Sequence, residues 1–263
     1  MVLRRSLREP ALTYELNVMG TVNVLEAVRL QGTGVRAVVV VTSDKCYENS
    51  GRAPRRFVET DPLGGDDPYS SSKACAELVT AAYRRSFFDE EGAPGVATAR
   101  AGNVIGGGDW GEDRLLPDSI RAVESGELLR VRNPKAVRPW QHILSPLSGY
   151  LQLAQELSEG RAARAWNFGP REHDVRTVSW VVERLAELWN GALSWEVDER
   201  ANPPEAGHLA LDSSDAERLL GWGPPSDLEH ALELVVDWHR AQQGGSDMRR
   251  VSLGQIAGSG QDS

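Results

Sequence analysis

Val35-Arg-Ala-Val-Val-Val-Val-Thr42 is an almost continuous run of β-branched residues. Because apolar and polar residues do not alternate in it, the run predicts a strand covered on both faces, as in a parallel sheet. Residues 12–31 before it carry apolar side chains every three or four positions, which predicts an amphipathic helix that stops at Gly32. The pattern therefore indicates an α/β protein.

The rest of the chain continues this alternation of helices and strands. We expect a helix over 69–89 and short strands over 95–101 and 165–169, which predicts a doubly wound, parallel, Rossmann-like sheet. The predicted domains are a partial dinucleotide-binding domain at 1–170 with substrate-lobe segments inserted near 104–142, a smaller, mostly helical substrate-binding lobe at 171–243, and a polar tail at 244–263.

Three stretches in the second half of the chain carry signals for the start of a helix. Thr177 precedes a run of apolar residues at helical spacing, and it can cap that helix. Ser214-Asp-Ala-Glu217 and Ser226-Asp-Leu-Glu229 have the spacing of capping boxes. In the polar tail, the short segment 248–256 is the candidate to dock on the protein.

The composition argues against several classes of protein. The 263 residues are 40% hydrophobic and 25% charged, which is typical of a globular chain, and no apolar run approaches the ~18 residues of a membrane span. The net charge of −9 argues against nucleic acid as a partner, because phosphate binding needs an excess of cations. Cys46 and Cys75 form neither a disulfide framework nor a metal-binding spacing, and no secretory signal is visible. We expect a cytoplasmic protein without a metal site.

Tyr69-Ser-Ser-Ser-Lys73 carries the main chemical signal. Positions i and i+4 of a helix share one face, so the phenol and the ammonium can point into one cleft. A nearby cation lowers the pKa of a phenol from its usual value of about 10. The pair therefore suits oxidation of a hydroxyl group to a carbonyl. The only other lysines in the sequence are Lys45 and Lys135. Either lysine is kept at these positions because an ammonium group is needed there, or its distribution is chance.

Ser43, Asp44 and Lys45 come directly after the β-branched run. The carboxyl ends of strands are where open α/β sheets bind ligands, so this hydroxyl, carboxylate and amine would face the Tyr-x-x-x-Lys helix across a cleft. A polar turn that merely ends a strand also contains serine and aspartate. The Tyr-x-x-x-Lys motif in the same chain favours the catalytic interpretation.

Together these motifs resemble the extended short-chain dehydrogenases/reductases that modify sugar nucleotides. Asp44-Lys45 is the pair typical of the CDP-glucose 4,6-dehydratases, whereas the dTDP-glucose enzymes carry Asp-Glu and the epimerases carry small or hydroxylic residues. The other stretches that resemble the CDP-glucose enzymes are 17–21, 67–77, 100–110 and 132–142. The resemblance extends from about Leu3 to Ile256.

The resemblance implies NAD as the cofactor of an internal oxidation, dehydration and reduction that yields a CDP-4-keto-6-deoxyhexose for deoxysugar biosynthesis. Tyr69 would take the C4 hydroxyl proton, and Lys73 would hold the cofactor's ribose. Ser43 would bond the 4-oxygen, and Asp44 would protonate the departing C6 hydroxyl. Lys45 stands where relatives use glutamate as the C5 base. An amine serves as a base only if its pKa is lowered, and otherwise it orients substrate or water, so the base stays open.

The resemblance also implies a site for the nucleotide-sugar substrate. The matching positions are Asn103, Arg114, Arg138, Asn167 and His208. The guanidinium forks of the two arginines suit paired phosphate oxygens. His208 is also explained as a residue satisfied within the fold, and most of the eight tryptophans predict core packing.

The first portion of the resembled enzymes has no counterpart in this sequence. Gly106-Gly-Gly108 does not fit the strand, Gly-rich turn and helix that hold a pyrophosphate. We therefore expect the β-branched strand to be a sheet edge open to pairing, and the isolated chain to bind NAD poorly. A misplaced start codon or a separately encoded N-terminal half would account for the difference.

Two further expectations concern partners and alternatives. The resemblance implies a homodimer. The alternatives to a CDP-glucose 4,6-dehydratase are a dehydratase or epimerase that acts on another nucleotide sugar, or a non-catalytic remnant that serves as a binding or interaction protein.

Overall fold

The computed structural model describes residues 3–31, 34–49, 54–200 and 206–259. The chain divides into two compact units. Unit 1 consists of Met1–Gly102, Leu147–Gly169 and Leu209–Gly223, and unit 2 consists of Asn103–Pro146, Pro170–His208 and Pro224–Ser263. Within the described ranges, no helix is both long and apolar enough to cross a bilayer.

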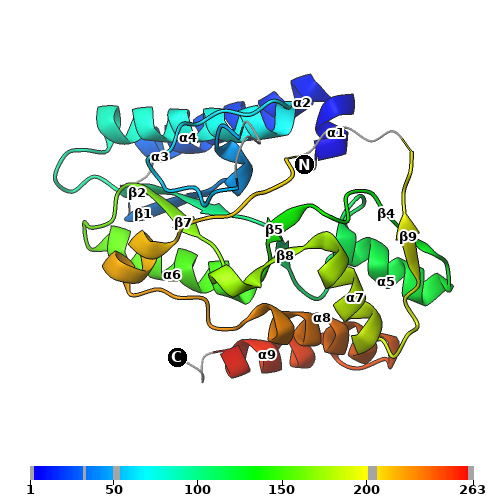
Figure 1. Cartoon of the computed structure of the whole chain (residues 1–263). Coiled ribbons are helices and arrows are strands. Elements are labelled where there is room, and N and C mark those ends of the chain that lie inside the picture. The colour runs from blue at the N-terminus through cyan, green and yellow to red at the C-terminus, as the bar shows by residue number, and fades with distance from the viewer. Residues whose placement is uncertain (1–2, 32–33, 50–53, 201–205, 260–263) are drawn as a thin grey trace. The chain divides into compact units, whose positions relative to one another are not determined.

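A three-stranded parallel sheet, of order β1-β2-β7, forms the centre of unit 1 (Figure 1). Its strands are β1 (Ala37–Val41), β2 (Gly95–Ala101) and β7 (Ala165–Phe168). Alternate residues along each strand point to opposite faces, so both faces need a cover. β1 lies at the edge of the sheet that the described residues form, as the sequence predicts.

Helices cover both faces of this sheet (Figure 1). On one face, Val38 and Val40 pack with residues of α3 (Gly20–Gln31) and α4 (Pro68–Phe87). On the other face, Ala97 and Ala99 pack against α6 (Leu144–Ser158). This arrangement, together with the solved relatives described below, confirms the predicted doubly wound, Rossmann-like fold.

The N-terminal helices follow the predicted pattern with one irregularity. α1 (Leu3–Arg8) comes first, and the helix predicted over 12–31 consists of α2 (Pro10–Tyr14), a π-helical turn and α3. Gly32, the predicted stop, lies outside the described residues. α4 begins at Pro68, where a missing N–H costs nothing, and Asp67 caps it by accepting from the Ser70 N–H at 2.9 Å.

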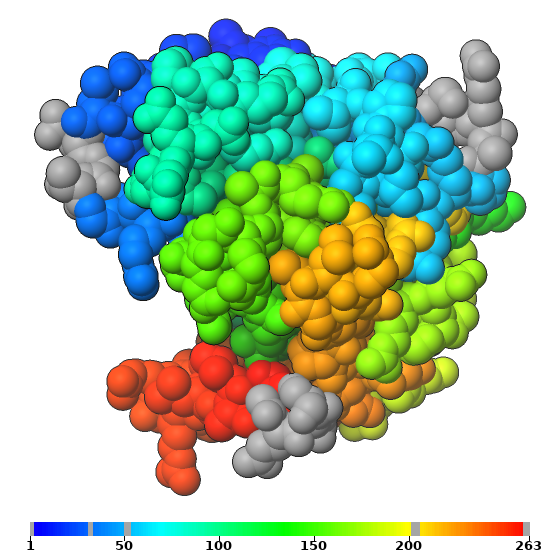
Figure 2. Space-filling view, turned by 90° about the vertical axis from the view of Figure 1, so that its left-hand side faces the viewer, coloured from blue at the N-terminus to red at the C-terminus, as the bar shows by residue number. Residues whose placement is uncertain are grey.

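A second surface of unit 1 joins α6 to the segment 209–223, which lie side by side in Figure 2. Gln152 Nε2 of α6 donates to the Leu220 carbonyl, and Trp222 Nε1 donates to Ser148 Oγ at 3.1 Å. The segment includes a π-helical turn at Ala216–Leu220. These bonds fix the segment against the face of the sheet that α6 covers.

Unit 2 is mostly helical, with short strands in pairs. Its described helices are α5 (Leu115–Ser125), α7 (Val178–Leu188), α8 (Leu228–Gln243) and α9 (Met248–Ser259). The strand pairs are β3 (Val104–Ile105) with β6 (Gln141–His142), β4 (Leu129–Val131) with β9 (Trp195–Val197), and β5 (Val137–Pro139) with β8 (Val175–Thr177). Apolar residues of α5, α7 and α8 share one buried core.

The capping residues differ in part from those that the sequence predicts. Thr177 caps α7 as expected, because its Oγ1 accepts from a backbone N–H three residues on at 3.2 Å. Asp227 rather than Ser226 caps α8, and Asp212 rather than Ser214 accepts the first N–H of the turn before Gly221. In both places a carboxylate stands at the position where the chain enters the helix, and it satisfies the unpaired N–H groups there.

The residues after Gly244, predicted as a polar tail, form a regular helix over much of their length. Trp238 Nε1 donates to Ser252 Oγ at 3.0 Å, and Gln255 Nε2 donates to the Leu234 carbonyl at 2.8 Å. These bonds dock α9 on α8. The docking expected for the segment 248–256 is therefore confirmed.

Two glycine-to-alanine changes are expected to affect stability in opposite directions. A Cβ at Gly149 in α6 would lie 2.4 Å from Phe168 Cδ1 and 3.0 Å from Trp222 Nε1. Because both rings are buried, Gly149→Ala should lower the free energy of unfolding by about 1–3 kcal/mol. Gly254 in α9 faces open space, so Gly254→Ala should raise it by about 0.5–1 kcal/mol. Thermal denaturation measures both, and Tm shifts of the same sign would contradict this packing.

Candidate active site

The polar turn after β1 lies at the carboxyl end of the parallel sheet. Thr42 continues the strand pairing, since its N–H donates to the Ala99 carbonyl at 2.9 Å. Ser43 Oγ then donates to Asp44 Oδ1 at 3.0 Å and accepts from the Lys45 N–H at 3.2 Å. Ser43 and Asp44 are 6% and 3% exposed. The predicted hydroxyl and acid therefore lie together at the edge where such sheets bind ligands.

Helix α4 brings its lysine to the same edge. Lys73 Nζ donates to the Val41 carbonyl, the last of β1, at 3.4 Å. Burial lowers the pKa of Lys73, while the charge of the Glu77 carboxylate acts in the opposite direction. Tyr69 is half-buried one turn earlier, on the same face of the helix. α4 thus places the Tyr-x-x-x-Lys motif beside the turn.

Tyr150 of α6 is a neighbour of this turn that the sequence analysis did not identify. Burial raises the pKa of its phenol, and the Asp44 carboxylate raises it further. The Tyr150 ring packs edge-on against Phe168 of β7, with centroids 5.5 Å apart. No motif includes Tyr150, because only the fold brings α6 to the β1 turn.

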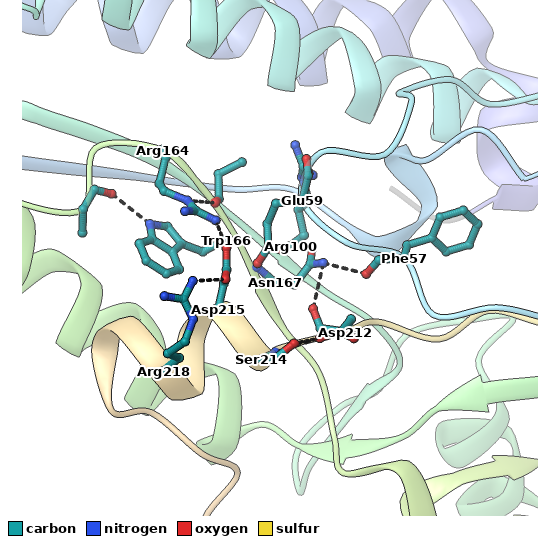
Figure 3. Close-up of polar contacts among 12 residues, drawn as sticks. Phe57, Glu59, Arg100, Arg164, Trp166, Asn167, Asp212, Ser214, Asp215 and Arg218 are labelled. Atoms are coloured by element: carbon teal, nitrogen blue, oxygen red, sulfur yellow. Dashed lines mark hydrogen bonds and ion pairs between the residues drawn. The ribbon is translucent and has the colours of Figure 1, made fainter.

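A buried hydrogen-bond network fixes Asn167 in β7 (Figure 3). Its Nδ2 donates to the carbonyls of Phe57 at 2.9 Å and Asp212 at 3.1 Å, and its Oδ1 accepts from the Tyr47 hydroxyl at 2.7 Å. Asn167 is fully buried, so its amide is committed to the fold. In the described structure the Asn167 amide thus bonds within the fold, and its contact with substrate stays a prediction.

The predicted diphosphate-binding cations lie in unit 2. Arg138 of β5 is buried, and its Nη1 donates to the Val137 carbonyl at 2.9 Å. His208 forms a β-bridge with Val137, and burial together with the charge of Arg138 lowers the pKa of His208. Arg114, directly before α5, is half-exposed and forms an ion pair with Asp109 at 2.9 Å. Of these predicted substrate-binding residues, Arg138 and His208 are therefore neighbours, and Arg114 lies at the start of α5.

Asn103 also belongs to unit 2, in the link from β2 to β3. Its carbonyl accepts from the Gln141 N–H at 3.2 Å, and its side chain is half-buried. The backbone bond anchors the loop, and the side-chain amide keeps its own capacity to bond.

The glycine-rich segment 106–108 serves close packing. A Cβ at Gly107 would lie 2.1 Å from the Trp238 ring, and one at Gly106 would lie 2.7 Å from Ile143 Cγ2. Both approaches are closer than real Cβ contacts allow, so these positions need glycine. Close packing thus accounts for glycine at 106 and 107. Among the residues that the structure describes, no group of three or more His, Cys, Asp and Glu side chains could hold a metal ion.

We expect His142 of β6 to make stability depend on pH. Burial lowers the pKa of His142 to about 4, with the charge of His230 adding to the effect. In the unfolded chain a histidine has a pKa near 6.5. Between that pH and about 4, His142 is therefore protonated in the unfolded chain and neutral in the folded chain. The free energy of unfolding should therefore fall by up to about 3 kcal/mol as the pH drops from about 6.5 to about 4.

The check is the urea midpoint measured across this pH range. His142→Gln should flatten the dependence, whereas the same change at His173, whose side chain is 59% exposed, should leave it as in the parent protein. A slope that is unchanged in His142→Gln would contradict the assignment.

Comparison with known proteins places the chain in a family. The family model described as GDP-mannose 4,6 dehydratase matches residues 1–235. The chain belongs to this family. Among curated members, the CDP-glucose 4,6-dehydratase of Salmonella typhimurium is 47% identical over 97% of this chain and 72% of its own length. A dTDP-glucose 4,6-dehydratase of Xanthomonas campestris is 29% identical over 91% of this chain and 70% of its own length.

Solved structures agree with membership of the GDP-mannose 4,6-dehydratase family. The dTDP-glucose 4,6-dehydratase of Streptomyces venezuelae with NAD bound superposes with a TM-score of 0.76 at 25% identity, covering 94% of this chain and 72% of that one. The UDP-glucose 4-epimerase of Thermotoga maritima shares the fold. It superposes with a TM-score of 0.78 at 20% identity, covering 92% of this chain and 74% of that one. Both the resemblance drawn from the motifs and the Rossmann-like fold are confirmed. The roles of individual residues stay predictions.

Proposed function

We propose that this chain is a CDP-glucose 4,6-dehydratase that uses NAD and forms a CDP-4-keto-6-deoxyhexose. The main structural support is the bond from Lys73 Nζ to the Val41 carbonyl at 3.4 Å, because it holds the Tyr-x-x-x-Lys helix at the turn that carries Ser43 and Asp44. The identity of 47% with the Salmonella CDP-glucose enzyme supports the choice of nucleotide, as does the Asp44-Lys45 pair.

The residues at this edge fit the reactive end of the cofactor. NAD, when bound, supplies the oxidant at C4 and the reductant at C6 of the hexose. Tyr69 and Lys73 would hold its ribose end, since both side chains are only half-buried at the sheet edge. The part of the chain that the structure describes offers no Gly-rich turn between a strand and a helix for the adenylate end.

Each catalytic side chain has a separate task in this proposal. Tyr69 accepts the proton of the C4 hydroxyl, and the Lys73 ammonium stabilises the phenolate during that step. Ser43 turns its hydroxyl from Asp44 to the 4-oxygen. Asp44 gives a proton to the C6 hydroxyl as it leaves as water. Lys45 is a candidate for the C5 base and otherwise orients substrate or water.

We also propose that Asn103, Arg114, Arg138 and His208 bind the nucleotide diphosphate. Guanidinium groups form paired hydrogen bonds with phosphate oxygens. Arg114 is half-exposed and shares its charge with Asp109, so a phosphate group can compete for it.

The test is to incubate the purified protein with NAD and, in parallel, with CDP-glucose, dTDP-glucose or GDP-mannose. Borohydride trapping and mass spectrometry then detect the 4-keto-6-deoxy product. Turnover of CDP-glucose supports the proposal, and turnover of dTDP-glucose alone would replace the substrate. An inverted hexose without loss of water would indicate an epimerase. Binding of CDP-glucose without any product would indicate a binding protein.

A homodimer is a further part of the proposal. Val24 and Leu30 of α3 and Leu78 and Phe87 of α4 are large apolar side chains that are at least 49% exposed. Exposed apolar side chains are candidates for an interaction surface, and α3 and α4 lie against each other. Light scattering should give twice the chain mass, and Leu78→Glu should halve it. A cytoplasmic location and a separately encoded N-terminal half stay predictions.

A further inference from the structure

Glu77 is a carboxylate in the interior of unit 1, one helical turn beyond Lys73 on α4. Its side chain is 3% exposed. A buried carboxylate is costly unless it is paired and fully hydrogen-bonded. The mechanism above gives Glu77 no task, so its contacts need an explanation of their own.

Both oxygens of Glu77 hold strands of the sheet. Oε1 accepts from the Thr42 hydroxyl, and Oε2 accepts from Thr98 Oγ1 at 2.7 Å and from Arg100 Nη2 at 2.7 Å. Thr42 directly precedes Ser43, and Thr98 lies in the middle of β2. One carboxylate therefore ties α4 to the start of the polar turn and to the central strand.

Arg100 extends this tie to the other end of the turn. It is as deeply buried as Glu77, and its Nη1 donates to the Tyr47 hydroxyl at 2.7 Å and to the Glu59 carbonyl at 3.1 Å. Its guanidinium also lies over the Tyr47 ring, 4.9 Å from the centroid. Tyr47 directly follows the turn Asp44–Cys46. The Glu77–Arg100 pair thus holds the turn at both ends, through Thr42 and Tyr47.

We propose that Glu77 is a positioning residue: together with Arg100 it fixes the turn that carries Ser43 and Asp44 relative to the helix that carries Tyr69 and Lys73. Its effect on turnover rests on the proposed dehydratase function, whereas the geometric claim does not. The same carboxylate supports the lysine electrostatically, because its negative charge raises the pKa of Lys73 against the effect of burial.

The first test measures Lys73 directly, without NAD or nucleotide sugar. Only a neutral amine reacts with an acetylating N-hydroxysuccinimide ester, so the pH midpoint of acetylation, followed by peptide mass spectrometry, reports the protonation of each lysine. Glu77→Gln keeps the shape and removes the charge, so the midpoint of Lys73 should fall by about 0.5 or more. Lys135, which is exposed in unit 2, is the internal reference.

Asp215→Asn is the matched control. This variant also removes a carboxylate from unit 1. The Asp215 carboxylate pairs with Arg164 and Arg218 at the opposite end of the sheet (Figure 3). The variant should leave the Lys73 midpoint at the wild-type value. A wild-type midpoint in Glu77→Gln would overturn the electrostatic part of the proposal. A shifted midpoint in a protein without turnover would count against the dehydratase function alone.

Thr42→Val tests the geometric tie even if Glu77→Gln does not fold. It removes one of the three donors to the carboxylate and leaves the charge in place. Amide hydrogen exchange should rise in residues 43–47 and stay unchanged in β7. Exchange at wild-type rates in residues 43–47 would overturn the tie.

Turnover separates the two effects of Glu77. In Glu77→Gln we expect kcat to fall about 10–100-fold with KM unchanged. The limb of the pH profile that reports Tyr69 should move to lower pH, because loss of a buried negative charge favours the phenolate. Glu77→Asp keeps the charge but shortens the side chain, which weakens its bonds to the strands. The limb of the pH profile should therefore return to its wild-type position, while kcat stays reduced. A limb that does not move in Glu77→Gln would contradict the electrostatic part.

Discussion

Replacement of Tyr69 by phenylalanine should lower kcat by about 10²–10⁴-fold, the range that a general base contributes. The phenyl ring keeps the size of the side chain on α4, so substrate binding and the position of Lys73 should change little. What is lost is the oxygen that takes the C4 hydroxyl proton. Since oxidation at C4 comes first, every later step should be lost with it.

Two measurements in D₂O test this order. The 4-keto product reports loss of water, and deuterium at C5 of the recovered CDP-glucose reports oxidation followed by enolisation. Tyr69→Phe should lose both signals. Tyr83→Phe is the matched control, because Tyr83 lies on the same helix and packs edge-on against Phe87, away from the β1 turn. Wild-type turnover in Tyr69→Phe would remove this phenol from the mechanism.

The central sheet could be predicted because its strands are local patterns. β1 is an apolar, β-branched run, and β2 and β7 are short segments between helical patterns, so the sequence indicates a parallel sheet. The strands of unit 2 have two or three residues each, too few to show any period. β4 and β9, for example, pair Leu129 with Trp195 across a long stretch of sequence, and only the assembled unit reveals this partner.

In the site, too, local motifs could be predicted from the sequence and contacts between distant residues could not. The turn after β1 and the Tyr-x-x-x-Lys helix are short motifs whose spacing carries their chemistry, so the sequence indicates both. Asn167 instead finds its partners in Phe57, Tyr47 and Asp212, all distant in sequence. Those bonds occupy its amide, and the sequence gives no sign of them. Glu77 and Tyr150 went unnoticed for the same reason, since the groups that define their roles come from other elements.

Replacement of Asp44 by asparagine should separate oxidation from loss of water. Asparagine keeps an oxygen that can accept the Ser43 hydroxyl, as Asp44 Oδ1 does at 3.0 Å, so the turn should keep its shape. It has no acidic proton to give to the departing C6 hydroxyl. We expect dehydration to fall about 10²–10⁴-fold, while deuterium still enters C5 because Tyr69 and Lys73 are intact.

Two neighbouring variants make the assignment specific. Ser43→Ala removes the bond to the 4-oxygen and should lower both signals together, since that bond assists oxidation. Lys45→Gln should abolish the entry of deuterium at C5 if the amine is the base, and should leave it if Lys45 only orients substrate or water. Equal loss of both signals in Asp44→Asn would place Asp44 in the oxidation step and contradict its role as the acid. Because Asp44 and Tyr69 stand on different elements of the fold, distinct patterns in their two variants would show that the turn and the helix serve successive steps.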